Sequence, residues 1–140
     1  MTYNNVEKID FSEIEKFASA FGFPNNEKIK DIFYENNAGE PENFYFKILN
    51  NGKFEEKKLR KLFSFDKNSD ENIYDAMSDV FSEKQNIVPF AIDNEDNYVC
   101  FVDDLFSQIM YYNTETMEFD EMYNENGEEY TEELFFEDIM

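Results

Sequence analysis

The charges of this chain are divided unequally along its length, and this division limits how the chain can fold. Residues 85–140 contain sixteen Asp and Glu and no Lys, Arg or His, whereas residues 1–84 contain seventeen acidic residues and all twelve basic ones. The net charges are therefore -16 and -5, out of -21 in total. Because so large a net charge opposes compaction, a binding partner explains it better than the fold does. Its sign argues against direct binding to nucleic acid or an anionic membrane, and it favours a basic protein as partner.

The chain nevertheless has the apolar content of a folded protein. Hydrophobic residues make up 41% and aromatic residues 19% of its 140 residues. This is enough to bury one core, so we predict a single domain over residues 1–140. No apolar run approaches the roughly 20 residues that span a bilayer, and the N-terminal residues lack the pattern of a signal peptide. A single cysteine, Cys100, suits a reducing compartment. We therefore expect a cytoplasmic monomer that has no contact with a membrane.

Apolar residues at helical spacing predict four helices. The first runs from Ser12 to Phe21, and Ser12 with Glu15 forms a capping-box pattern at its start. The second follows Phe23-Pro24 and is capped by Asn25 or Asn26. The buried stripes expected for the second, third and last helices are Ile29, Ile32 and Phe33; Ile73, Met77, Val80 and Phe81; and Tyr130, Leu134, Phe135 and Ile139.

Alternating apolar residues and short polar turns predict about six strands. The first hairpin has a strand over Phe44–Leu49, the turn Asn50-Asn51-Gly52 and a return strand within Leu59–Phe65. Four more strands follow the third helix, over Val88–Ile92, Tyr98–Val102, Ile109–Tyr112 and Met117–Tyr123. Because short loops join neighbouring strands, we expect antiparallel pairing. The fold class is α+β, with an antiparallel sheet of about six strands and helices packed at the N-terminal, middle and C-terminal segments.

The residue types argue against an enzyme. The chain has no histidine, which removes the commonest general base and metal ligand. Cys100 stands in the middle of a predicted strand and is interpreted as a buried structural thiol. Segments beginning at Asp66 and Asp93 partly match the calcium loop of an EF-hand, but Glu71 and Tyr98 replace its required glycine. We interpret both as turns and expect no catalytic residue, no cofactor and no metal site.

The basic residues cluster at Lys57, Lys58, Arg60 and Lys61, on the predicted return strand of the hairpin. Four charges beside an acidic body make a poor nucleic-acid site. We interpret the cluster as a solvated strand face that pairs internally with carboxylates of residues 85–140, the acidic half of the chain.

The acidic half supplies the candidate partner-binding residues. Its carboxylates gather around predicted loops and strand ends, and nearby tyrosines offer the aromatic anchors that protein interfaces favour. Such a surface either serves solubility alone or steers a basic protein into contact, which raises association rates by about one to three orders of magnitude. The predicted contact residues are Asp93, Glu95, Asp96, Asp103, Asp104, Tyr111, Tyr112, Glu115, Glu118, Asp120 and Glu121.

The run Ile87–Asp93, a polar turn and the run Tyr98–Val102 resemble the central hairpin of the SUKH superfamily. In that family a strand with the pattern hydrophobic-Pro-hydrophobic-Ala precedes a Gly-Asp turn and an apolar strand that often carries Cys. Phe23-Pro24, Asn51-Gly52, the segment QIMYYN and the closing ELFFEDI lie in the family's order. The Gly-Asp turn is replaced here by Asp96-Asn97.

The resemblance implies an immunity protein of bacterial origin, because the SUKH family consists largely of proteins that neutralise polymorphic toxins, often nucleases. This chain would bind a cognate basic toxin and block its active site. Some members of the fold serve cellular regulation, so a scaffold or regulatory module is an alternative. A nucleic-acid mimic that blocks varied basic proteins would share the charge and need no dedicated partner.

Overall fold

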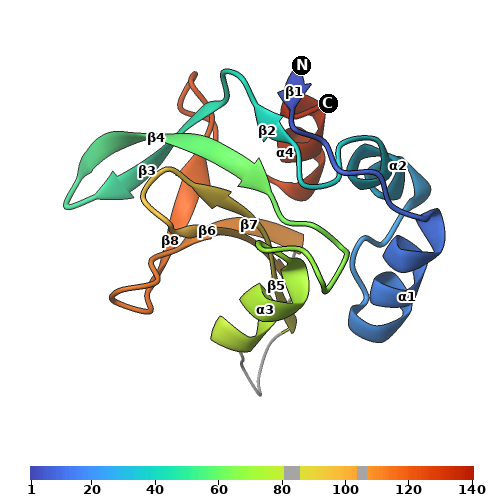
Figure 1. Ribbon diagram of the computed structural model, residues 1–140. Helices are drawn as coiled ribbons and strands as arrows, with labels where there is room; N and C mark the ends of the chain where they lie inside the picture. Colours follow the sequence, from blue (N-terminus) through green and yellow to red (C-terminus); the bar gives the residue numbers. More distant parts are fainter. Residues whose placement is uncertain (81–85, 104–106) are drawn as a thin grey trace.

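The computed structural model describes residues 1–80, 86–103 and 107–140, and it confirms the α+β fold class (Figure 1). The described residues form four helices and eight strands. In chain order they are β1 (Tyr3–Asn4), α1 (Phe11–Phe21), α2 (Glu27–Glu35), β2 (Glu40–Pro41), β3 (Tyr45–Asn50), β4 (Lys53–Leu62), α3 (Ile73–Asp79), β5 (Asn86–Asp93), β6 (Tyr98–Asp103), β7 (Ser107–Tyr112), β8 (Phe119–Tyr123) and α4 (Glu132–Asp138).

Strands β3 to β8 pair in chain order, and β8 returns to pair with β3, so the antiparallel sheet closes into a barrel. Side chains that alternate along the strands fill its interior. Phe46 and Ile48 on β3, Tyr111 on β7 and Met122 on β8 are all buried there. The antiparallel pairing agrees with the sequence prediction, whereas closure of the sheet was not predicted.

Helices α1, α2 and α4 lie on one side of the barrel, with α1 and α2 at the right of Figure 1 and α4 behind β2, whereas α3 lies at the bottom of the view. An aromatic cluster joins them to the sheet. Phe90 on β5 lies 5.5 Å from Phe23 and 5.4 Å from Phe136 between ring centroids. The Phe90 ring also lies 5.8 Å from Phe33 of α2 and 5.6 Å from Phe135 of α4. Through these five rings the barrel shares one core with α2 and α4.

Polar caps begin the helices close to the expected residues. Asn26 caps α2 by accepting the backbone N–H of Ile29 at 3.0 Å. The start of α1 differs from the prediction, because Asp10 rather than Ser12 is its N-cap and accepts the backbone N–H of Ser12. Gly22 ends α1 with a left-handed φ of 73°, a conformation that glycine adopts without steric cost.

Two predicted elements have different bounds in the structure. The return strand of the first hairpin is β4, which starts directly after the turn at Lys53, not at Leu59. Its first six residues are mostly charged and none is buried, because the hairpin projects from the barrel, so no apolar alternation marked them. The third helix ends at Asp79, with Val80 as C-cap, and the predicted stripe residue Phe81 lies outside the described residues.

A second, smaller apolar cluster lies on the outer face of the sheet, under α3. It contains Val80, Ile87, Cys100, Val102 and Tyr112. The Cys100 thiol is fully buried, as interpreted from the sequence, and burial raises its pKa well above the ordinary value. None of the described helices is long and apolar enough to cross a membrane.

Candidate functional site

The turn between β5 and β6 is built around the side chain of Asp93. Its carboxylate accepts the backbone N–H of Glu95 at 3.0 Å and that of Asn97 at 2.9 Å. Asp96 takes a left-handed φ of 63°, which closes the turn. Such a side-chain-to-backbone turn is typical of Asp and Asn. It projects Glu95 and Asp96 into solvent while Asp93 itself is buried.

Tyr111 of β7 joins this turn to the barrel interior. Its hydroxyl donates to Asp93 at 2.5 Å and accepts from the side-chain amide of Asn97 at 2.8 Å. Burial raises the pKa of Asp93, against the lowering effect of its hydrogen bonds. Burial and the bond to Asp93 raise the pKa of Tyr111. All three side chains are buried, so the turn is fixed by a closed polar network.

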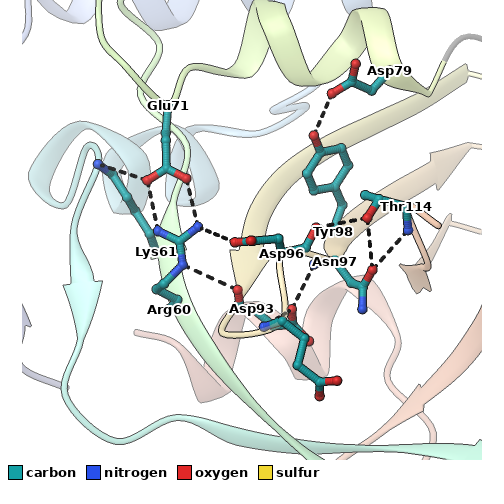
Figure 2. Close-up of polar contacts among 10 residues, drawn as sticks. Arg60, Lys61, Glu71, Asp79, Asp93, Asp96, Asn97, Tyr98 and Thr114 are labelled. Carbon is teal, nitrogen blue, oxygen red and sulfur yellow. Dashed lines mark hydrogen bonds and ion pairs between the residues drawn. The ribbon is translucent and has the colours of Figure 1, made fainter.

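The loop between β7 and β8 docks onto the same turn (Figure 2). Thr114 donates its backbone N–H to the Asn97 side chain at 3.0 Å and its hydroxyl to the Asp96 carbonyl at 3.2 Å. Asn113 accepts the backbone N–H groups of Glu115 and Thr116 and shapes the rest of the loop. The acidic residues of turn and loop therefore lie at one end of the barrel.

Arg60 of β4 holds the turn from its other side (Figure 2). Its guanidinium makes two hydrogen bonds to the Glu71 carboxylate, at 2.9 and 2.8 Å, and one to Asp96 at 3.0 Å. The Lys61 ammonium lies 3.9 Å from an oxygen of the Glu71 carboxylate. The hydrogen bond from Arg60 is the largest cause that lowers the pKa of Glu71. This bidentate pair connects the start of α3 to the turn.

We expect the Arg60–Glu71 pair to contribute a coupling free energy of about 1 kcal/mol, because both side chains are about one-third exposed. A double-mutant cycle with R60M and E71Q, measured by urea unfolding at about pH 7, tests this value. Since the folded pKa of Glu71 is lowered, the coupling is present above the ordinary pKa of a glutamate and is lost as pH falls through the lowered one. A coupling that persists in strong acid would contradict the assignment.

Lys57 of β4 lies on the inner face of the barrel, at the same end as this turn. It stands opposite Phe46 in the β3–β4 pairing, so its side chain points toward the interior. Its ammonium lies 2.8 Å from Glu95 and 3.5 Å from Glu55. Burial alone would lower the pKa of Lys57, but the hydrogen bond and charge of Glu95 and the charge of Glu55 outweigh burial and raise it.

Asp120 of β8 faces the same interior, opposite Tyr111. Partial burial, followed by the charges of Glu118 and Glu55, raises its pKa. The charge of Lys57 lowers the pKa of Asp120, but burial and the two glutamates outweigh it. We define the acidic end as the carboxylates around this mouth of the barrel: Glu95, Asp96, Glu115, Glu118 and Asp120. They share one lysine, Lys57, and one arginine, Arg60, among the described residues.

The structure separates the other predicted contact residues from the acidic end. Asp103 is opposite Ser107, at the far end of β6 from the turn, about 16 Å away at about 3.3 Å per residue. Asp104 lies outside the described residues. Glu121 alternates with Asp120 and therefore points to the outer face of β8. The predicted acidic surface is thus divided among at least two places.

Three predicted contact residues are buried and cannot touch a partner in this structure. Asp93 is 0% exposed, Tyr111 1% and Tyr112 6%. Tyr111 points into the barrel, whereas Tyr112 packs against Phe119 in the second cluster, with 4.9 Å between ring centroids. Tyr111 and Tyr112 are therefore not exposed anchors in this structure, because one lies in the barrel core and the other in the second apolar cluster.

Of the residues that hold the acidic end in place, sequence reasoning missed Glu71 and Thr114 and identified Lys57 and Arg60 only as members of the basic cluster. The available signal was the basic cluster of β4. Its predicted pairing with the acidic half occurs in Lys57–Glu95 and Arg60–Asp96. The cluster is less solvated than expected, since the side chains of Lys57 and Lys61 are 11% and 17% exposed.

Comparison of the chain with protein-family models, with curated proteins and with solved structures finds no match. The resemblance to the SUKH superfamily therefore stays a prediction from the sequence. Among the described residues, no group of three or more Asp, Glu and Cys side chains is placed to hold a metal ion. What the geometry presents is a rigid, negatively charged protein surface.

Proposed function

We propose that this chain is a cytoplasmic immunity protein of the SUKH type that binds a cognate basic toxin, of nuclease type, and blocks its active site. The observation that carries the proposal is the acidic end, where Glu95, Asp96, Glu115, Glu118 and Asp120 surround one mouth of the barrel. A nuclease concentrates Lys and Arg where it binds phosphates, and a rigid acidic surface occupies the same residues by complementary charge.

The fixed geometry supports specific binding over general attraction. The turn that carries Glu95 and Asp96 is held by Asp93, Tyr111 and Arg60 before any partner arrives. A preorganised surface loses less conformational entropy on binding than a mobile acidic tail would. This argument favours a dedicated partner over a nucleic-acid mimic, whose carboxylates need only be numerous.

We infer a binding protein in preference to an enzyme. Cys100, the single thiol of the chain, is fully buried and its pKa is raised, so it is held as the unreactive thiol. Without histidine, Ser-His and Cys-His nucleophile pairs have no base. The proposed inhibition needs none of these groups, because it works by occupying the toxin's surface.

The partner is identified by affinity capture from the native host, with bound proteins eluted by rising salt. One dominant basic protein that carries a toxin-like domain supports the proposal. Many unrelated basic proteins that all elute at moderate salt would indicate a charge mimic, and a housekeeping complex alone would indicate the regulatory module.

With the captured toxin in hand, we expect the quadruple variant E95Q/E115Q/E118Q/D120N to associate about 10- to 100-fold more slowly at low salt, because steering acts on the association rate. The matched control E15Q/D31N/E35Q/E137Q changes the net charge equally at exposed carboxylates outside the barrel. We expect its rate to change less than about threefold. Stopped-flow or surface-based kinetics measure both, and equal slowing in the two variants would rule out the acidic end as the docking face.

A further inference from the structure

The outer face of the first hairpin carries an exposed apolar patch. Leu49 of β3 and Phe54 of β4 stand opposite each other in the strand pairing and are 41% and 52% exposed. The ring of Tyr123 on β8 packs edge-on against Phe54, with 5.1 Å between centroids. We define these three side chains as the hairpin patch: Leu49, Phe54 and Tyr123.

The barrel does not need these side chains for its core. On β3 the alternate residues Phe46 and Ile48 point inward and are buried, so Leu49 is on the solvent side. Single exposed apolar residues are ordinary, but two exposed ones paired across a hairpin and flanked by a half-buried tyrosine form a contiguous patch, which is typical of a binding surface. Aromatic side chains of this kind provide much of the affinity in protein interfaces.

Three carboxylates, those of Glu121, Glu125 and Glu129, lie on the β8 side of the patch, whereas Lys47 stands opposite Tyr123 on β3. Tyr123 donates its hydroxyl to Glu121 at 2.7 Å, and this bond, with burial and the charges of Glu121 and Glu129, raises the pKa of Tyr123 to about 12. The Lys47 ammonium donates a hydrogen bond to the backbone carbonyl of Glu125 at 3.1 Å, and the side chain of Glu125 is exposed. An apolar centre bordered on one side by carboxylates is complementary to an apolar side chain that has Lys or Arg on that side.

We propose that the hairpin patch is the docking site for a basic protein segment, which places an apolar side chain against Leu49, Phe54 and Tyr123 and its Lys or Arg against the carboxylates on the β8 side. The proposal deepens the proposed function, because it names the apolar anchor of the same basic partner. Asp120, at the mouth of the barrel, and Tyr123, on the outer face, are three residues apart on β8, about 10 Å, a distance that one partner of ordinary interface size spans around the rim. A second copy of this chain is a poor occupant, because it carries the same charge of -21.

The test needs no toxin. Random twelve-residue peptides displayed on phage are selected against the wild-type protein at low salt, and the enriched sequences are made as synthetic peptides. We expect them to combine Lys or Arg with an aliphatic or aromatic residue. Their affinity for the variant L49T/F54T should fall at least about tenfold, because a truncated interface anchor has an effect of this size. Threonine keeps the strand preference of the hairpin.

The matched control is V6T, which changes another apolar residue, 39% exposed, outside the barrel. We expect it to bind the peptides as the wild type does. A second variant, E121Q/E125Q/E129Q, leaves the apolar centre intact and should weaken binding and its salt dependence, so the test does not depend on one variant folding. Thermal unfolding and circular dichroism confirm that each variant is folded.

Several results would overturn the proposal: no enriched peptides, peptides that bind L49T/F54T as tightly as the wild type, or purely basic peptides that bind all variants alike. A wild-type dimer in sedimentation that L49T/F54T dissociates would assign the patch to a second copy instead. Because peptides replace the toxin, this experiment fails independently of the capture experiment. A captured toxin that binds L49T/F54T normally leaves the proposed function standing and removes only the patch.

Discussion

Replacement of Phe90 by alanine is expected to lower the free energy of unfolding by about 3–5 kcal/mol, the usual range for a buried phenylalanine. Phe90 is 0% exposed, and its ring contacts four others, from Phe23, Phe33, Phe135 and Phe136. The first two precede or belong to α2 and the last two belong to α4, so the cavity opens where the helices join the barrel. The neighbouring rings belong to the loop before α2, to α2 and to α4. Because these segments cannot all move inward, little of the cavity closes by relaxation.

Urea unfolding followed by circular dichroism measures this loss. The matched control is F54A, the same substitution at a side chain that is 52% exposed, for which we expect about 1 kcal/mol or less. Single domains have unfolding free energies of about 5–15 kcal/mol, so F90A removes a large share of the stability. A loss for F90A no larger than that for F54A would mean that the aromatic cluster does not tie helices to sheet.

The helices could be predicted from sequence because their signals are local. Apolar spacing places Ile14 and Phe17 on one face of α1, and both are buried. Asn26 caps α2 as expected. Closure of the barrel could not be predicted in this way, because it depends on the pairing of β3 with β8, about 75 residues apart, and no local pattern specifies a register over that distance.

The candidate site was predictable in its charge and not in its geometry. Counting carboxylates along the chain identifies Glu95, Asp96, Glu115 and Glu118, because the residue type and a position in a polar turn suggest exposure without any knowledge of the fold. The burial of Tyr111 and Tyr112 was missed for a physical reason. One face of β7 lines the barrel and the other lies in the second apolar cluster, so both neighbours are buried and alternation is lost.

Charge and apolar surface have different roles in the proposed complex. The acidic end acts over distances up to about 10 Å at ordinary salt, and it therefore governs how quickly a basic partner arrives. The hairpin patch acts only in contact, so it governs how slowly the partner leaves. Added salt should reduce the association rate of the wild-type protein strongly and its dissociation rate weakly.

Replacement of Asp93 by alanine is expected to lower the free energy of unfolding by about 3 kcal/mol. The substitution removes the acceptor of three hydrogen bonds, from the backbone N–H groups of Glu95 and Asn97 and from the hydroxyl of Tyr111. Each buried donor left without an acceptor costs about 1–3 kcal/mol, partly offset because a buried charge is also removed. Urea unfolding measures the loss. Because the turn also carries Glu95 and Asp96, D93A should slow toxin association as well.

The variant D93N separates the charge of Asp93 from its hydrogen bonds. The folded pKa of Asp93 is raised, mainly by burial, so the folded protein holds this proton more tightly than the unfolded chain does. Stability from this group is therefore fully present below the ordinary aspartate pKa and is lost as pH rises through the raised one. The unfolding free energy of the wild type relative to D93N should fall over that window and then level off. A constant difference would show that Asp93 is not perturbed by burial, and a rising one that its hydrogen bonds outweigh the loss of hydration.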